Sequence, residues 1–375
     1  MHNFKVLTAL VITLISVSFK TFAQTPLSQN ASISLLTCNP GDELYSVFGH
    51  TAIRVFDPAT RFDVVYNFGT FDFDTPNFYG KFIKGDLQYF VSASSYEDFV
   101  YTYQYYNRDV YEQQLNLTPQ QKQNIATELN IRLTSDKRFY TYKFIHRNCT
   151  TIVADIINQY IPTKISLKNN DSGMTYREII HSRLNNHFFE DLGINLIFGA
   201  PTDITSEKLF LPNELMQGVS NTTTANGPLA KFTTTAYKAT PKEQQFSFDR
   251  WWVLTLVCLI MLAISRNKIF QRSFLAITGL FGIFFCCVGL YSLHSEITYN
   301  YNALLFNPLF LLLLYFIFSR KHKAILMTSY TCLGLIAVYL IILINKPHLA
   351  TVLPLIILTT TVLVHITLHA KKKIA

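Results

Sequence analysis

The last third of the chain alternates long apolar runs with short polar loops, a pattern that predicts membrane helices. The runs lie at residues 249–265, 273–293, 303–318, 324–344 and 349–369. The first and third runs are short, because a helix needs about 20 apolar residues to cross a bilayer. We therefore expect their ends to be extended or tilted. The pattern predicts an all-α membrane domain of about five transmembrane helices over residues 249–375.

The region before these runs has the mixed pattern of a globular domain. Leu44–Val55 alternates like a strand, a turn signal follows, and Asp63–Phe68 alternates again. If the two strands pair as a hairpin around residues 59–60, Asn67 comes close to His50.

Helical periodicity follows in three places. Thr118-Pro119-Gln120-Gln121 carries the capping-box signature, and its helix is expected to run to about Ser135. Further helices are expected at about 149–160 and 174–185. Residues 219–245, rich in Thr, Asn, Ala and Lys, are predicted to form a loop or linker. Strands and helices together predict an α+β domain.

The N-terminus has the composition of a secretory signal. Lys5 precedes the apolar stretch Val6–Phe19, and Thr21-Phe22-Ala23 forms a small-x-small cleavage site. Residues 1–23 are therefore predicted to be a signal peptide, and residues 24–248 an exported domain. An uncleaved anchor helix is the alternative.

Basic residues mark alternate loops of the membrane region. The clusters after the first, third and fifth runs are Arg266, Lys268 and Arg272, then Arg320, Lys321 and Lys323, then Lys371, Lys372 and Lys373. The two loops between them carry only Lys346. Under the positive-inside rule the clusters are cytoplasmic. This predicts a multi-pass protein of the bacterial inner membrane, with its N-terminal domain in the periplasm and its C-terminus in the cytoplasm. The net charge of +8 then needs no nucleic acid as a partner.

Cys149 is the strongest candidate for chemistry. It opens a predicted helix, where the helix dipole lowers the pKa of a thiol and favours the thiolate. His50, on the upstream strand, is the expected base, and Asn67 the group that orients its imidazole. The backbone N–H of Cys149 can stabilise an oxyanion. His146 is a rival base, and a second interpretation makes Cys149 a small buried hydrophobe beside a structural histidine.

The positions of the other cysteines limit which of them can be the reactive thiol. Cys258, Cys286, Cys287 and Cys332 lie in the apolar runs, which leaves Cys38 and Cys149 in the exported domain. A disulfide between these two is the alternative to a reactive thiol. No zinc-ligand spacing occurs, so we expect neither a metal nor a cofactor.

The motifs around these residues resemble the Lnb family of lipoprotein N-acyltransferases, whose periplasmic domain is followed by membrane helices. The resemblance covers most of residues 35–215. The matching segments are Tyr45–Val55, Val65–Phe71, Asn148-Cys149-Thr150-Thr151, Thr175-Tyr176-Arg177-Glu178, Asp191-Leu192-Gly193, Gly199–Asp203, Phe210-Leu211-Pro212, Asn300-Tyr301-Asn302 and Asn307-Pro308-Leu309. One departure is Val153-Ala154-Asp155, where a basic residue is expected before the aspartate.

The resemblance implies a permuted papain-like (NlpC-like) exported domain, related to the lecithin:retinol acyltransferase group. It also implies a function. Cys149 takes an acyl chain from a membrane phospholipid as a thioester, and the chain passes to the amino group of a lipoprotein's lipidated N-terminal cysteine. His50 moves the protons, and Asn67 orients it. The partners are thus a phospholipid donor and a lipoprotein acceptor.

Other residues carry weaker expectations. Asn300, Asn302 and Asn307 surround the outer end of the third apolar run and are candidate substrate-binding residues. The alternative is that they cap helices. Arg177 and Asp203 are expected to form a buried pair that supports the fold.

Two further segments are given ordinary structural interpretations. His294 and Glu296 are interpreted as ordinary polar residues of the same outer loop. The aromatic segments Phe71-Asp72-Phe73 and Phe78-Tyr79 are interpreted as core or rim packing rather than an acyl groove.

Two other functions are compatible with the same motifs. The first is a membrane-tethered Cys–His peptidoglycan amidase or endopeptidase, for which five helices are more than a tether needs. The second is a non-catalytic membrane sensor or transport protein. The apolar runs contain few ionisable residues, which argues against an ion path.

Overall fold

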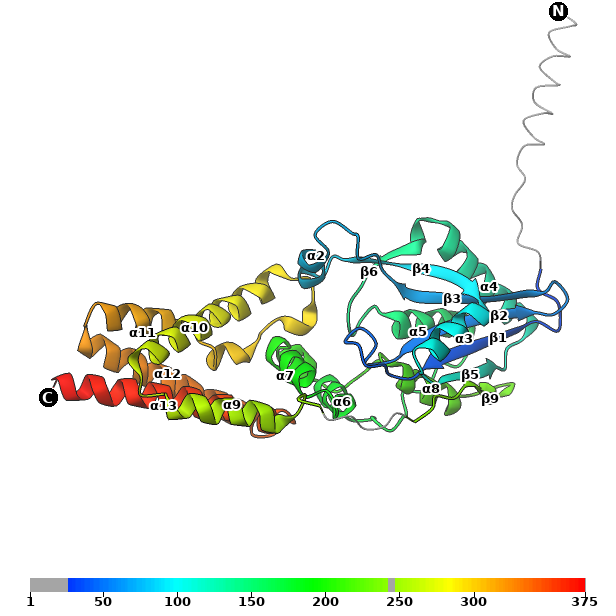
Figure 1. The fold of residues 1–375 in the computed structure, drawn as a ribbon. Coiled ribbons are helices and arrows are strands. Elements are labelled where there is room, and N and C mark those ends of the chain that lie inside the picture. Colours follow the sequence, from blue (N-terminus) through cyan, green and yellow to red (C-terminus); the bar gives the residue numbers. More distant parts are fainter. Residues whose placement is uncertain (1–25, 242–246, 375) are drawn as a thin grey trace, which may run out of the picture.

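The structure is a computed structural model that describes residues 26–241 and 247–374. The predicted signal peptide at residues 1–23 lies outside this description. An α/β region occupies one end of the molecule and the helices from Trp251 onward occupy the other (Figure 1).

A seven-stranded antiparallel sheet forms the centre of the α/β region, in the order β6-β4-β3-β2-β1-β5-β9. Its strands are β1 (Ser32–Cys38), β2 (His50–Asp57), β3 (Phe62–Thr70), β4 (Gln88–Ser95), β5 (Val110–Leu115), β6 (Phe139–Thr141) and β9 (Ala230–Tyr237). The short strands β7 (Thr223–Thr224) and β8 (Gly227–Pro228) pair separately.

The predicted hairpin is confirmed in β2 and β3. Asp57 pairs with Phe62 and Ala52 pairs with Asn67, so the turn is centred between residues 59 and 60. Strand β2 starts at His50 rather than at the expected Leu44, because residues 44–48 form hydrogen-bonded turns. Gly49 ends these turns at φ 85°, and an added Cβ there would lie 2.6 Å from the carbonyl oxygen of Cys38.

Seven α-helices accompany the sheet within the described residues of this region. They are α2 (Phe78–Lys84), α3 (Tyr96–Tyr105), α4 (Pro119–Thr134), α5 (Cys149–Tyr160), α6 (Tyr176–Arg183), α7 (Phe188–Ile197) and α8 (Pro212–Ser220), with 3₁₀ turns η1 (Asp136–Arg138) and η2 (Ala200–Asp203). The expected helices near 119–135, 149–160 and 174–185 are confirmed as α4, α5 and α6.

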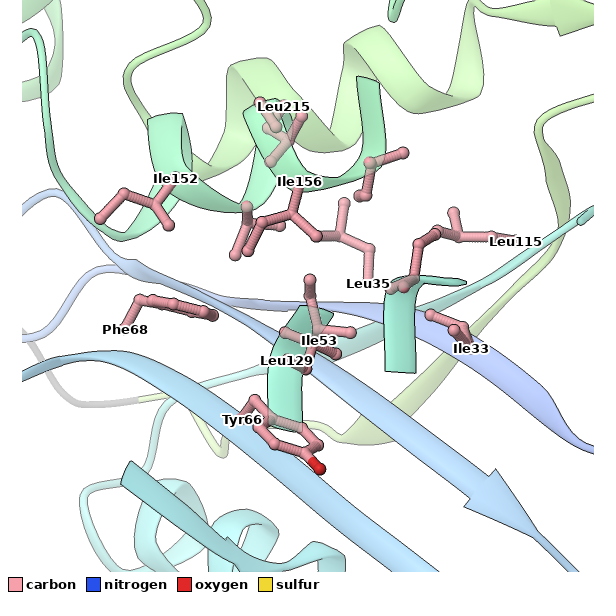
Figure 2. Packing of buried hydrophobic residues seen from close by; sticks show 14 of the residues in the cluster. Ile33, Leu35, Ile53, Tyr66, Phe68, Leu115, Leu129, Ile152, Ile156 and Leu215 are labelled. Atoms are coloured by element: carbon pink, nitrogen blue, oxygen red, sulfur yellow. The ribbon is translucent and has the colours of Figure 1, made fainter. Parts of the chain in front are cut away.

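The main core lies between the sheet and helices α4, α5 and α8. Ile152 and Ile156 of α5 and Leu215 of α8 pack over strand residues such as Leu35 and Ile53 (Figure 2). Neighbouring strand residues point the other way, because side chains alternate along a strand, and they pack against Phe99 and Tyr103 of α3. Helix α5 is thereby fixed directly on β2 and β3.

The prediction of a loop over residues 219–245 was wrong in part. Ala230–Tyr237 forms β9, which pairs with β5 at the sheet edge. Its threonines favour an extended backbone, and β5 offers unpaired backbone groups. Most of its side chains are exposed, so it lacks the apolar alternation that identifies a strand.

The membrane region contains α9 (Trp251–Ala263), α10 (Lys268–Tyr291), α11 (Leu309–Phe318), α12 (His322–Leu343) and α13 (Leu349–Ile374), with η3 (Ser295–Ile297) and η4 (Tyr301–Leu304) before α11. Four described segments are long and apolar enough to cross a membrane. They are Lys268–Tyr291, Ser295–Phe318, His322–Leu343 and Leu349–Ile374, so the third predicted run is extended at its N-terminal end.

Helix α9 corresponds to the first predicted run, but it has only 13 residues and is not among these four segments. Its first residue, Trp251, lines a pocket together with Thr351 of α13. Just past its end, the Ser265 hydroxyl lies 3.2 Å from Nδ1 of His365. The helix therefore runs beside α13 from near Thr351 to near His365 (Figure 1).

Candidate active site

Asn148 determines where α5 begins. Its Oδ1 accepts the backbone N–H of Thr151 at 2.9 Å, and the Thr151 hydroxyl accepts the backbone N–H of Asn148 at 2.9 Å. The amide of Asn148 also donates to the carbonyls of Phe144, at 2.6 Å, and Phe210, at 2.9 Å. This buried side chain thus places Cys149 as the first residue of the helix.

The Cys149 thiol is free and half-buried at this helix N-terminus. Burial acts to raise its pKa. The positive charge of His50, together with hydrogen bonds from His50, the Thr51 N–H and the Thr150 hydroxyl, outweighs that effect and lowers the pKa from its ordinary value of 9.0. The thiolate, which is the nucleophilic form, is therefore favoured.

His50 and Asn67 meet across the hairpin, as the sequence predicted. Nε2 of His50 lies 2.7 Å from Oδ1 of Asn67. A carbonyl oxygen only accepts, so Nε2 carries a proton and Nδ1 is the nitrogen left to interact with the sulfur. The geometry brings the three predicted site residues together; their catalytic roles stay predictions.

Gly69 provides the space for the imidazole. A Cβ at this position would lie 2.9 Å from Cε1 of His50, which is closer than side-chain packing allows. The sequence contains this glycine beside Asn67, but no local signal shows what faces it.

Replacing Gly69 with alanine is expected to displace the imidazole and to raise the pKa of Cys149. Once the pKa lies above the pH of the assay, each further unit of rise reduces the thiolate fraction about tenfold. Alkylation of Cys149 by iodoacetamide measures this. Gly193→Ala is the matched control, because a Cβ there meets nothing within 4 Å. An unchanged alkylation rate in Gly69→Ala would contradict the packing argument.

Two buried threonines join the helix to the strand beneath the thiol. The hydroxyls of Thr51 and Thr150 lie 3.1 Å apart, and neither residue is exposed. Thr51 follows His50 in the chain and Thr150 follows Cys149, so this contact fixes the two candidate catalytic residues relative to each other. Neither threonine has a role that the sequence predicted.

The rival interpretations lose support from the geometry. His146 is exposed, and its ring lies edge-on to Tyr176 at 6.5 Å. Cys38 and Cys149 are both free thiols, so they do not form a disulfide. Cys38 is fully buried, and burial raises its pKa, in the opposite direction to the shift of Cys149.

The loop between α10 and α11 reaches the segment that precedes Cys149. Glu296 is 1% exposed, and its Oε1 accepts the backbone N–H of Ile145 at 2.9 Å. Lys143 donates to the carbonyl of Leu293 in the same loop at 2.7 Å. The interpretation of Glu296 as an ordinary loop residue was wrong, because this carboxylate is buried against the nucleophile's loop.

Replacing Glu296 with leucine is expected to slow alkylation of Cys149 several-fold. The Ile145 N–H would lose its acceptor, and an unsatisfied buried donor costs about 1–3 kcal/mol. Glu296→Gln keeps an acceptor oxygen and should react at nearly the wild-type rate. Tyr299→Ala, which removes an 84%-exposed side chain from the same loop, is the control. Equal rates in all three variants would show that the contact does not position the thiol.

The three asparagines near the membrane have structural partners. Asn300 caps η4 and donates to the carbonyls of Leu196 and Ile197 in α7. Asn302 is fully buried and accepts from the Tyr339 hydroxyl at 2.6 Å, while Oδ1 of Asn307 accepts the N–H of Leu309 at 2.9 Å. The contacts of Asn300 and Asn307 match the capping alternative, whereas Asn302 lies within η4 and caps no helix. A substrate-binding role for the three asparagines stays a prediction.

Arg177 and Asp203 form the expected buried pair. Nε of Arg177, a residue 2% exposed, donates to Oδ1 of Asp203 at 2.6 Å. Lys346, between α12 and α13, pairs with the other carboxylate oxygen of Asp203 at 2.9 Å. The two ends of the molecule are thus joined by a charged contact as well as by Glu296.

One group of possible metal ligands occurs among the described residues. His187, Glu190 and Asp249 bring their ligand atoms within 4.8 Å of one another. None of them belongs to the Cys149 site, and we assign no ion to them.

The fold and the site define a protein with apolar helices that can cross a membrane and an α/β domain that holds a Cys–His–Asn group. Residues 18–182 match the family model described as the Lnb N-terminal periplasmic domain, a stretch that contains all three residues. This similarity supports an Lnb-type family. No curated protein and no solved structure matches the chain.

Proposed function

We propose that this protein is a lipoprotein N-acyltransferase of the permuted papain-like (NlpC-like) type. It moves an acyl chain from a membrane phospholipid, through a thioester on Cys149, to the amino group of a lipoprotein's lipidated N-terminal cysteine. One observation carries the proposal: the Cys149 thiol has a lowered pKa and is hydrogen-bonded to His50. It lies in an Lnb-like domain that is joined to apolar helices able to cross a membrane. The histidine strand precedes the cysteine helix, which is the permuted order.

In the first half-reaction the thiolate of Cys149 attacks the ester carbonyl of the phospholipid. The backbone N–H of Cys149 lies at the helix start, where N–H groups lack intrahelical acceptors, and stabilises the oxyanion. When the tetrahedral intermediate collapses, the ester C–O bond breaks. The lysophospholipid alkoxide then takes the proton from Nδ1 of His50.

In the second half-reaction the acceptor amine attacks the thioester carbonyl. Neutral His50 takes a proton from the amine, the C–S bond breaks, and an amide forms as the thiolate is regenerated. Asn67 holds the imidazole through Nε2 in both steps. The half-buried position of the sulfur limits access by water, which would otherwise hydrolyse the thioester.

The proposed location is the bacterial inner membrane, with the catalytic domain in the periplasm and the C-terminus in the cytoplasm. The three basic clusters support this orientation. This orientation requires α9 to cross the membrane. Ser265, which directly precedes Arg266, contacts His365, so the chain after α9 lies beside the C-terminal part of α13.

The contacts between the two ends of the molecule favour this proposal over the peptidoglycan hydrolase. A passive tether needs no contact with the active-site loop. Here Glu296 binds the backbone of Ile145, and Lys346 pairs with Asp203.

The proposal is tested with the full-length protein in nanodiscs that contain a labelled phospholipid. Mass spectrometry should find the labelled acyl chain on Cys149. Adding a diacylglyceryl-cysteinyl peptide should move the chain to the peptide amine. Peptidoglycan cleavage without any acyl-enzyme would overturn the proposal.

A further inference from the structure

Helix α2 and the loop before it expose large apolar side chains at one edge of the domain. Phe73 is 63% exposed, Tyr79 75% and Phe82 45%. Ile83 and Tyr45 are also exposed. The sequence interpretation as core or rim packing holds, because Phe71 and Phe78 pack against the main core. The exposed rings of Phe73 and Tyr79 pack at its rim against them. Contiguous exposed apolar surface indicates an interaction site.

This surface lies at the outer end of a membrane-spanning helix. The Ser292 hydroxyl, directly after α10, donates to the carbonyl of Ile83 at 2.8 Å. The Leu293 N–H donates to the carbonyl of Lys84 at 2.7 Å. Figure 1 shows α2 beside the chain that follows α10. Because α10 is long and apolar enough to cross the bilayer, the backbone of α2 lies at the membrane surface.

The last residues of α10 are also large, apolar or aromatic, and exposed. Leu290 is 89% exposed and Tyr291 62%. Aromatic rings at the end of a span are typical of the membrane–water boundary. The exposed rings of α2 therefore continue the surface by which α10 contacts lipid.

A row of contacting aromatic rings runs from this surface into the core on which Cys149 packs. The ring of Phe73 lies 4.9 Å from that of Phe71, Phe71 lies 5.1 Å from Tyr89, and Tyr89 lies 4.5 Å from Tyr142. Burial and the negative charge of Cys149 both raise the pKa of Tyr89, so the sulfur is within electrostatic reach of this row. The row of rings therefore leads from the exposed surface to the surroundings of the thiol.

We propose that α2, with Phe73 and Tyr79, inserts into the outer leaflet of the membrane, and that the acyl chain of the donor lipid follows this aromatic surface to Cys149. The second half of this statement rests on the proposed acyltransferase function; the membrane contact does not. Asp72 and Asp74 offset Lys81 and Lys84, so burial of apolar rings, rather than attraction to anionic lipid, drives the contact.

Photocrosslinking tests the membrane contact without any need for activity. The full-length protein is placed in phosphatidylcholine nanodiscs whose lipid carries a diazirine in one acyl chain. Crosslinks are expected on Phe73, Tyr79 and Phe82, as on Leu290. Tyr101 and Tyr105 of α3 are 65% and 73% exposed and serve as controls that should not react. Crosslinks confined to α9–α13 would overturn the proposal.

A pair of double variants tests the acyl path. Phe73→Ser with Tyr79→Ser should reduce acylation of Cys149 by nanodisc phospholipid at least tenfold. Its alkylation by water-soluble iodoacetamide should be unchanged, since the thiol itself is intact. Tyr101→Ser with Tyr105→Ser should match wild type in both assays. Undiminished acylation in the first variant would overturn the path. Absence of acylation in wild type would instead overturn the proposed function, and the crosslinks alone would then decide the membrane contact.

Discussion

Replacing Cys149 with alanine is expected to abolish acyl transfer while the protein stays folded and inserted in the membrane. The alanine removes the sulfur that carries the proposed thioester, so the loss should be roughly a thousandfold or more. Cys149→Ser should be nearly as inactive. The site activates Cys149 by lowering its pKa, and the pKa of a serine hydroxyl is far too high for the same effect to ionise it. Intact-mass analysis of the acyl-enzyme and of the acceptor peptide measures both half-reactions.

The stability of these variants can be measured separately from their activity. Asn148 and Thr151 make the helix cap, and Cys149 contributes no side chain to it. Thermal unfolding should therefore change little. Cys38→Ala is the matched control, since Cys38 is the other thiol of the α/β region and its pKa is raised by burial. Full transfer by Cys149→Ala would refute the thioester mechanism, whatever the stability of the variant.

Replacing His50 with alanine is expected to move the alkylation profile of Cys149 to higher pH. The charge and hydrogen bond of His50 lower the thiol pKa against the opposing effect of burial. Without them burial dominates, so the pKa rises. At any pH below the raised pKa, the thiolate fraction falls about tenfold for each unit by which the pKa exceeds that pH. Iodoacetamide alkylation measured between about pH 5 and pH 10, on either side of the ordinary thiol range, gives the shift directly.

Two variants separate the contributions to this effect. Asn67→Ala should shift the profile less than His50→Ala, because the imidazole remains and only its Nε2 contact is lost. His146→Ala should leave the profile unchanged, since its ring faces Tyr176. An unchanged profile in His50→Ala, together with a shifted one in His146→Ala, would assign the base to His146.

Local patterns in the sequence were sufficient for the elements that carry the site. The turn between β2 and β3 predicted a hairpin, and the hairpin register then brought Asn67 to His50. The capping box at Thr118 predicted α4, and the polar residues around Cys149 predicted α5. Each of these signals lies within a few residues of the structure that it predicts.

Long-range contacts had no such signal. Strand β9 was missed because the strand that it pairs with, β5, lies more than a hundred residues earlier in the chain. The same holds for the Lys346–Asp203 pair.

The sequence by itself determined the alternation of apolar runs and basic loops, the hairpin, and the helix that opens at Cys149, because periodicity, turns and caps act between near neighbours. Only the tertiary structure decided that Thr51 contacts Thr150, 99 residues away, and that Glu296 binds Ile145 across 151 residues. It also decided that α2 lies against the end of α10. These contacts depend on how whole helices and strands pack against each other. A buried hydroxyl or carboxylate then needs a hydrogen-bond partner, because leaving it unpaired away from water costs free energy.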